Sequence, residues 1–137
     1  MRENLNNKLY QLAKDVSKNS YSPYSEFKVG CALIDVNGNI YYGTNVENAS
    51  YGLTCCAERN AIFSSFSSQK NLSVDKLVIY TPTKDVTAPC GACRQVINEF
   101  SNKSTKIILI CDDKAKSIEL SIDELLPYSF GRVDLNV

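Results

Sequence analysis

The chain has 137 residues, of which 44% are hydrophobic and 22% charged, and its 15 basic and 15 acidic side chains cancel. This length fits a single domain, residues 1–137, with a substantial core. Because a chain without net charge creates no long-range field, we expect neither nucleic acid nor an anionic membrane as partner, and a small neutral substrate instead.

The expected cellular location, the six cysteines and the absence of histidine restrict the reactions that this chain can catalyse. No apolar run approaches the roughly 18 residues of a membrane span, and the polar N-terminus lacks a signal-peptide core, so we expect a cytoplasmic protein with reduced thiols. Six cysteines also allow three disulfides, which a non-secreted domain of this size rarely needs. The absence of histidine excludes Ser-His-Asp triads, Cys-His dyads and His-ligated metals, so carboxylate, tyrosine, lysine, thiol or water must transfer protons.

Hydrophobic periodicity predicts helices alternating with strands. Apolar residues at three- and four-residue steps predict an amphipathic helix over residues 4–18. A Pro/Ser-rich loop then leads to a buried strand, 27–35, and an Asn-Gly turn precedes its return strand, 40–43. The remaining predicted elements are helix 56–66 with Thr54 as its N-cap, strand 76–81, helix 90–101, strand 106–111, a short strand 117–120 and a helical turn 122–126. We expect the ordered part to end near Gly131.

This order of elements predicts an α/β domain with helices on both faces of one mixed sheet. Sites in such folds lie at strand carboxyl ends and helix N-termini. Two cysteine-containing motifs stand where helices 56–66 and 90–101 are predicted to begin. By contrast, Cys31 and Cys111 lie in apolar strands and are interpreted as core residues.

The cysteine spacing indicates a metal site. Cys90 and Cys93 are three residues apart, so both thiols can hold one ion, although a lone Cys-x-x-Cys also fits a redox pair or half of a zinc finger. A structural zinc takes four protein ligands, and a second Cys-x-x-Cys is missing. Cys55 and Cys56 are adjacent and do not suit one ion together. Three protein ligands leave one coordination position open, which is the pattern of a catalytic zinc.

Cys56 is the better third ligand because Glu58 follows it by two residues. In the first turn of a helix both side chains can reach an ion above the helix N-terminus, where Glu58 can take and return a proton without being a ligand. Three thiolates leave the site with excess negative charge, which the two helix N-termini offset in part. Arg59 and Arg94 can neutralise more, although each also fits a surface charge, and Gln95 is placed to orient an arginine or a sulfur.

A polar segment precedes the first motif. Asn45 and Glu47 alternate around Val46, which puts both polar side chains on one side of an extended segment. A solvated turn explains the spacing equally well.

The ordered pair of motifs is the pattern of zinc deaminases, in which three cysteines hold zinc and a nearby glutamate is acid and base. Over most of its length the chain resembles the cytidine deaminases of the small homotetrameric type with three zinc-binding cysteines. The residues that carry the resemblance are Ser22-Pro23-Tyr24-Ser25-x-Phe27-x-Val29-Gly30, Asn45-Val46-Glu47-Asn48-Ala49-Ser50-Tyr51, Cys56-Ala57-Glu58-Arg59, Pro89-Cys90-Gly91-Ala92-Cys93-Arg94-Gln95-Val96 and Leu125-Leu126-Pro127-x-x-Phe130. Cys55 departs from this pattern and has no role in it.

The resemblance implies an α/β/α sandwich around a five-stranded mixed sheet, one Zn²⁺ per chain, and a homotetramer with active sites shared between subunits. It implies that Phe27 stacks near the pyrimidine, that Asn45 and Glu47 bind the ribose hydroxyls, and that the Ala57 backbone and Glu58 read the base edge. Tyr51 and Phe130 would help to close the pocket, partly from neighbouring subunits.

The implied activity is hydrolytic deamination of cytidine and deoxycytidine to uridine and deoxyuridine, with release of ammonia, in pyrimidine salvage. Glu58 would pass a proton from the attacking water to N3 and then to the leaving amino group. A deaminase for another aminopyrimidine, for a nucleotide or for nucleic acid is a second enzymatic hypothesis, and a zinc-stabilised binding module is the non-enzymatic one.

Overall fold

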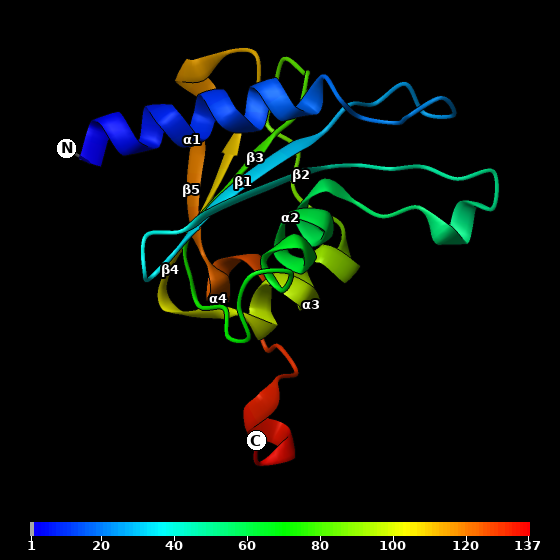
Figure 1. Cartoon of the computed structure of the whole chain (residues 1–137). Coiled ribbons are helices and arrows are strands. Elements are labelled where there is room, and N and C mark those ends of the chain that lie inside the picture. The colour runs from blue at the N-terminus through cyan, green and yellow to red at the C-terminus, as the bar shows by residue number, and fades with distance from the viewer. Residues whose placement is uncertain (1) are drawn as a thin grey trace.

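The structure is a computed structural model and describes residues 2–137. Its elements follow the predicted order (Figure 1). In chain order they are α1 (Arg2–Ser17), β1 (Gly30–Asp35), β2 (Ile40–Thr44), α2 (Ala57–Ser65), β3 (Val74–Tyr80), α3 (Gly91–Glu99), β4 (Ser101–Ile110), β5 (Ile118–Ser121) and α4 (Ile122–Leu125).

The five strands form one mixed sheet in the order β2-β1-β3-β4-β5. β3 and β4 are parallel, with Leu77 opposite Ile107, and the other neighbouring pairs are antiparallel. The parallel pair is connected through α3, as a crossover between parallel strands requires. The carboxyl end of β3 therefore lies on the same edge of the sheet as the start of α3.

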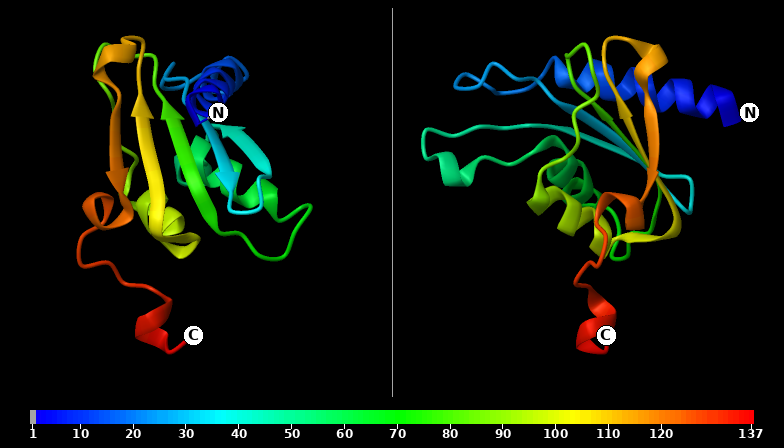
Figure 2. Two further views of the ribbon diagram at one scale, coloured as in Figure 1. Left: turned by 90° about the vertical axis from the view of Figure 1, so that its left-hand side faces the viewer. Right: turned by 180° about the vertical axis from the view of Figure 1, so that it is seen from behind.

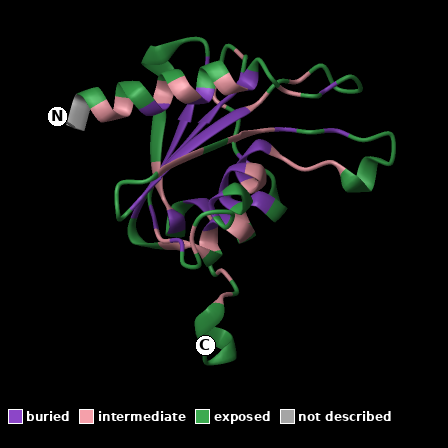
Figure 3. Cartoon of the chain, in the orientation of Figure 1, coloured by how far each residue is buried: buried purple, intermediate pink, exposed green. Residues whose placement is uncertain are grey.

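Helices cover both faces of the sheet, which confirms the predicted three-layer α/β/α sandwich. α1 lies on one face and α2, α3 and α4 lie on the other (Figures 1 and 2). Because side chains alternate along a strand, Ala32, Val78 and Ile108 pack under α1, whereas Leu33, Leu77 and Ile107 pack against the other helices. β1, most of β3 and the second half of β4 are therefore buried on both sides, whereas the edge strands β2 and β5 are partly exposed (Figure 3). Within residues 2–137, none of the helices has the length and apolar character that crossing a membrane requires.

Two glycines let helices approach the sheet closely. A Cβ on Gly43 of β2 would lie 2.5 Å from the main-chain nitrogen of Ala61 in α2, and one on Gly30 of β1 would lie 1.8 Å from the Ala13 carbonyl of α1. A Cβ at such distances fits only if the helix backbone moves away. Gly43 thus sets how closely α2, and the motif at its N-terminus, packs on β2.

Several predicted boundaries were wrong. β4 begins at Ser101 rather than at residue 106, and α3 ends at Glu99 rather than at residue 101. β1 begins at Gly30 rather than at residue 27, because the main chain of Phe27 and Val29 is hydrogen-bonded by a side chain and not by a neighbouring strand. The N-cap of α2 is Cys56 rather than Thr54, because Cys55 is still paired with Val46 in extended form. The described chain also continues beyond Gly131, with a short 3-10 turn at Arg132–Leu135 that is held by its own hydrogen bonds.

Two long segments, 18–29 and 44–55, extend together away from the sheet (Figure 1). Their main chains are joined where Tyr21 donates to Asn45 and Glu47 donates to Tyr21, at 3.2 and 2.8 Å. Val46 and Cys55 exchange a second pair of main-chain hydrogen bonds at 2.9 and 3.0 Å. Residues 45–47 are thereby fixed between the first segment and the start of α2.

Candidate metal centre and active site

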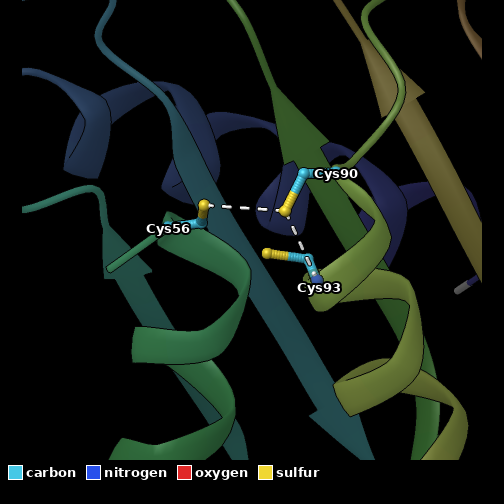
Figure 4. Close-up of side chains that lie close together, drawn as sticks. All are labelled: Cys56, Cys90 and Cys93. Carbon is cyan, nitrogen blue, oxygen red and sulfur yellow. Dashed lines mark hydrogen bonds between the residues drawn. The ribbon is translucent and has the colours of Figure 1, made fainter. Parts of the chain in front are cut away.

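The N-termini of α2 and α3 converge on a cluster of three sulfurs. Cys56 and Cys90 are the N-cap residues of the two helices, and Cys93 lies in the first turn of α3. All three sulfur atoms lie within 4.8 Å of one another and point toward a common centre (Figure 4). Sulfurs bound to one tetrahedral zinc lie about 3.8 Å apart, given Zn–S bonds of about 2.3 Å. The donor set and its spacing therefore fit zinc, with a fourth position left for another group.

The sulfur cluster lies in a positive environment. Both helices direct their N-terminal ends at it, and the Arg59 guanidinium donates to Cys56 Sγ at 3.3 Å. The hydrogen bond from Cys93, together with Arg59, lowers the pKa of Cys56 to about 5 despite burial. The same hydrogen bond and burial raise the pKa of the Cys93 thiol. A divalent cation that binds here displaces the remaining protons, because metal ligation requires thiolates.

Glu58 lies beside the sulfurs, in the first turn of α2, and is only 4% exposed. Burial, opposed by hydrogen bonds and reinforced by the nearby Cys56 thiolate, raises the pKa of Glu58 to about 7. A carboxyl group with a pKa near neutrality can both accept and donate a proton at the pH of a cell. Glu58 therefore has the properties of a proton carrier rather than of a permanently charged ligand.

A pocket of about 300 Å³ adjoins the cluster and Glu58. It brings together the side chains that were predicted to bind substrate from the same chain: Phe27, Asn45, Glu47 and Ala57. A volume of this size accommodates a small organic molecule. The remaining lining residues are Ser25, Val29, Thr54, Ile79, Thr81, Thr87, Ala88 and Pro89, with Cys56, Glu58 and Cys90 at the cluster end.

Asn45 fixes the wall of this pocket. Its side chain accepts from the Val29 amide at 2.9 Å and from the Ser20 hydroxyl, and donates to the Phe27 carbonyl at 2.7 Å. The bonds to Phe27 and Val29 replace those of a neighbouring strand on both sides of Lys28. One N–H of the Asn45 amide remains for a ligand, since a primary amide has two.

Glu47 is held in the same way by the loop before Phe27. One of its carboxylate oxygens accepts from the amides of Tyr24 and Ser25, and the other accepts from the Ser25 hydroxyl. Hydrogen bonds from Ser25, with one from the Tyr24 amide, keep the pKa of Glu47 below its ordinary value. Glu47 is therefore an ionised acceptor in the lining of the pocket. The sequence interpretation missed Ser25, although Ser25 stands in a quoted motif next to a Pro-Tyr turn.

Cys93 and Arg59 lie at the sulfur cluster, and four further predicted residues lie outside the pocket lining. Arg94 donates to the carbonyls of Pro89 and Leu125, at 2.9 and 2.7 Å, so it braces the segment before Cys90. Gln95 donates to the Phe130 carbonyl at 3.0 Å rather than to an arginine or a sulfur. Phe130 is 60% exposed, and Tyr51, 74% exposed, packs edge-on against Tyr24.

The α/β sandwich, the three thiols and the buried carboxylate beside a pocket define the class of zinc-dependent deaminases. A family model described as the cytidine and deoxycytidylate deaminase zinc-binding region matches residues 3–110. The chain belongs to this family, and its cofactor is zinc.

Relatives match over nearly the whole chain. A cytidine deaminase of Sporosarcina psychrophila is 41% identical over 129 residues, covering 94% of this chain and 93% of the relative. One of Mycoplasma pneumoniae is 42% identical over 119 residues, covering 85% and 87%. The crystal structure of a cytidine deaminase from Burkholderia pseudomallei matches with a TM-score of 0.85 and 38% identity, over 90% of this chain and 98% of that one.

Proposed function

We propose that this chain is a hydrolase that deaminates cytidine and deoxycytidine to uridine and deoxyuridine, with release of ammonia, in pyrimidine salvage. The observation that carries the proposal is Glu58, buried beside three thiols in a pocket that Glu47 also lines. Relatives at 41% and 42% identity are cytidine deaminases, which supports a pyrimidine nucleoside as substrate.

Cys56, Cys90 and Cys93 would hold the zinc ion, which supplies a Lewis acid that lowers the pKa of water. Glu58 accepts a proton from the attacking water and delivers it to N3 of the base, while the oxygen bonds to C4. It then carries the second proton of that water to the amino group, the C4–N bond breaks and ammonia leaves. One carboxylate serves as base and acid in turn, which suits a chain without histidine.

The pocket wall orients the nucleoside. Phe27 packs against the pyrimidine ring, the Ala57 backbone reads the base edge, and the free N–H of Asn45 and the Glu47 carboxylate bind the ribose hydroxyls. Arg59 offsets excess thiolate charge through its hydrogen bond to Cys56. Ionised Glu47 accepts hydroxyl protons, which favours a free ribose.

The proposal includes the working state of the chain. Residues 1–137 act as one domain in the cytoplasm, as a homotetramer in which Tyr51 and Phe130 contribute to neighbouring sites. Support comes from large apolar side chains that remain exposed on this single chain: Tyr51, Leu53, Phe63, Phe66, Phe130, Val133 and Leu135.

A substrate panel tests the function. Ammonia release from cytidine, deoxycytidine, their 5′-monophosphates, other aminopyrimidine nucleosides and single-stranded DNA is measured with the zinc-loaded protein. We expect the highest kcat/KM for cytidine and deoxycytidine. Release of ammonia from DNA or from a monophosphate, but not from cytidine, would overturn the proposal.

A further inference from the structure

The segment 25–29 separates two cavities. Ser25, Phe27 and Val29 line the catalytic pocket, whereas Glu26 and Lys28 line a second hollow of about 450 Å³. From Phe27 to Val29 the alternation follows the period of two of an extended chain, in which neighbouring side chains point to opposite sides. The second hollow therefore lies directly behind the wall that carries Phe27.

The second hollow is positively charged. Lys14 and Lys18 enter it from the end of α1 and its exit, and Lys28 enters from segment 25–29, with Glu26 as the one carboxylate among its lining residues. Ser17, Tyr80 and Pro82 complete the lining. Lys14 and Lys18 also suit the negative end of α1, but that end does not account for Lys28, which comes from a separate segment.

The positive charges of these lysines are largely available to bind an anion. Lys18 has an exposed ion pair with Asp15 at 3.4 Å, and Lys14 lies over the Tyr80 ring at 5.8 Å. Across residues 2–137, neither Lys14 nor Lys28 forms an ion pair with a carboxylate. Like charges that line one concavity focus a positive potential, in a chain whose net charge is zero.

We propose that this hollow binds the phosphate group of a small molecule, at a site separate from the catalytic pocket, and that its occupancy acts on the pocket wall. Lysine ammonium groups are point charges that suit a phosphate dianion. The volume accommodates either inorganic phosphate or a phosphate monoester such as a nucleotide.

The route to the active site is short. Lys28 directly follows Phe27. Glu26, which directly precedes Phe27, has a left-handed backbone, with φ of 58°. Non-glycine residues adopt this conformation only under constraint. An anion that draws Lys28 toward Lys14 shifts Phe27 within its pocket, so we expect a change in KM for cytidine rather than in kcat.

Calorimetric titration of the zinc-loaded protein with inorganic phosphate and with AMP, at matched ionic strength, tests the binding. We expect a dissociation constant of about 1 mM or tighter for at least one probe. Binding of both assigns the site to the phosphate group itself, and binding of AMP alone assigns it to a nucleotide. Adenosine, which lacks the phosphate, serves as the control for occupancy of the catalytic pocket and should not bind. If neither probe binds, the proposal is overturned.

A matched pair of double variants locates the site. Lys14→Gln/Lys28→Gln should weaken binding by roughly tenfold or more, the effect of losing about 1.4 kcal/mol. Lys70→Gln/Lys103→Gln removes the same charge from exposed positions outside the hollow and should bind as the unmodified chain does. Equal binding by the two double variants would overturn the assignment.

The coupling rests on the proposed function, whereas the binding does not. Saturating phosphate or AMP should change KM for cytidine by at least about fivefold, with kcat within about twofold, and the Lys14→Gln/Lys28→Gln variant should lose this effect. Binding without a change in KM would overturn the coupling. If cytidine is not deaminated at all, the calorimetry still decides whether the anion site exists.

Discussion

Glu58 is the residue on which the proposed chemistry depends most directly. Replacing it with Gln keeps the side-chain size and removes the group that exchanges protons, so kcat should fall by about 10²–10⁴-fold. Zinc content should stay near one ion per chain, because Gln leaves the three thiols in place. Ammonia release and metal analysis on the same preparation check both statements. Turnover close to that of the unmodified chain would refute the acid–base role.

The adjacent cysteines at positions 55 and 56 should respond in opposite ways to substitution. Cys56→Ala should lose zinc, because its sulfur belongs to the cluster. Cys55→Ala should keep zinc, because Cys55 contributes its main chain, which exchanges hydrogen bonds with Val46. Metal analysis of both variants decides this, and the reverse pattern would assign the third thiolate to Cys55.

The sequence was sufficient to predict the cluster at the level of single residues. Cys-x-x-Cys spacing and the Cys56–Glu58 pair are local, and each begins a helix, so chain order alone brings them to helix N-termini. The hydrogen bonds of Asn45 were not predictable, because its partners Phe27 and Val29 lie 18 and 16 residues away in a loop without regular pairing.

At the scale of elements, α2 is held on β2 by close contact at Gly43. Gly43→Ala should cost about 1–3 kcal/mol of stability, because its Cβ would overlap the backbone of α2 at Ala61 and Ala57. Activity should fall as well, since α2 carries Cys56 and Glu58 at its N-terminus. Urea unfolding and ammonia release measure the two effects.

Gly52→Ala is the control for this substitution, because no atom lies within 4 Å of its added Cβ. It should change stability by less than about 0.5 kcal/mol. If Gly43→Ala is as stable as this control, the close contact does not constrain α2.

Helices and central strands could be predicted because their apolar periodicity is strong, whereas boundaries depended on contacts distant in sequence. The start of β1 is set by Asn45, and the start of α2 by the pairing of Cys55 with Val46. A Thr followed by helix-forming residues indicates an N-cap locally, but this pairing keeps the chain extended as far as Cys56.

At the scale of the whole molecule, Tyr51 and Phe130 are exposed aromatic residues that do not line the pocket of their own chain. If Phe130 of one subunit completes the site of another, specific activity should fall when the protein is diluted below the dissociation constant of the tetramer. Phe130→Ala should raise KM without loss of zinc, since the cluster is formed within one chain. Light scattering and activity over a dilution series test this. Constant activity in a demonstrated monomer would contradict the shared site.

Tyr51 and Phe130 were the hardest site residues to place, because their proposed role depends on contacts between chains. Phe27, Asn45 and Glu47 come to the pocket through contacts within the chain, where the family resemblance rather than spacing alone had put them. Phe130 lies on the C-terminal segment that extends away from the sheet, with its carbonyl bound by Gln95 and Asn98 (Figure 1). Its proposed role depends on a surface that the sequence of one chain does not position.

The closeness of the three sulfurs also makes the site sensitive to oxidation. Cys56 Sγ and Cys90 Sγ are 4.0 Å apart, a short movement from the roughly 2.05 Å of a disulfide. Bound zinc occupies the thiolates and so protects them, whereas a chelator exposes a thiolate whose low pKa makes it reactive. Chelation under a reductant should therefore be reversed by added zinc. After chelation in air, the protein should lose two titratable thiols and its activity together. Bound zinc would then preserve the redox state of the cysteines that hold it.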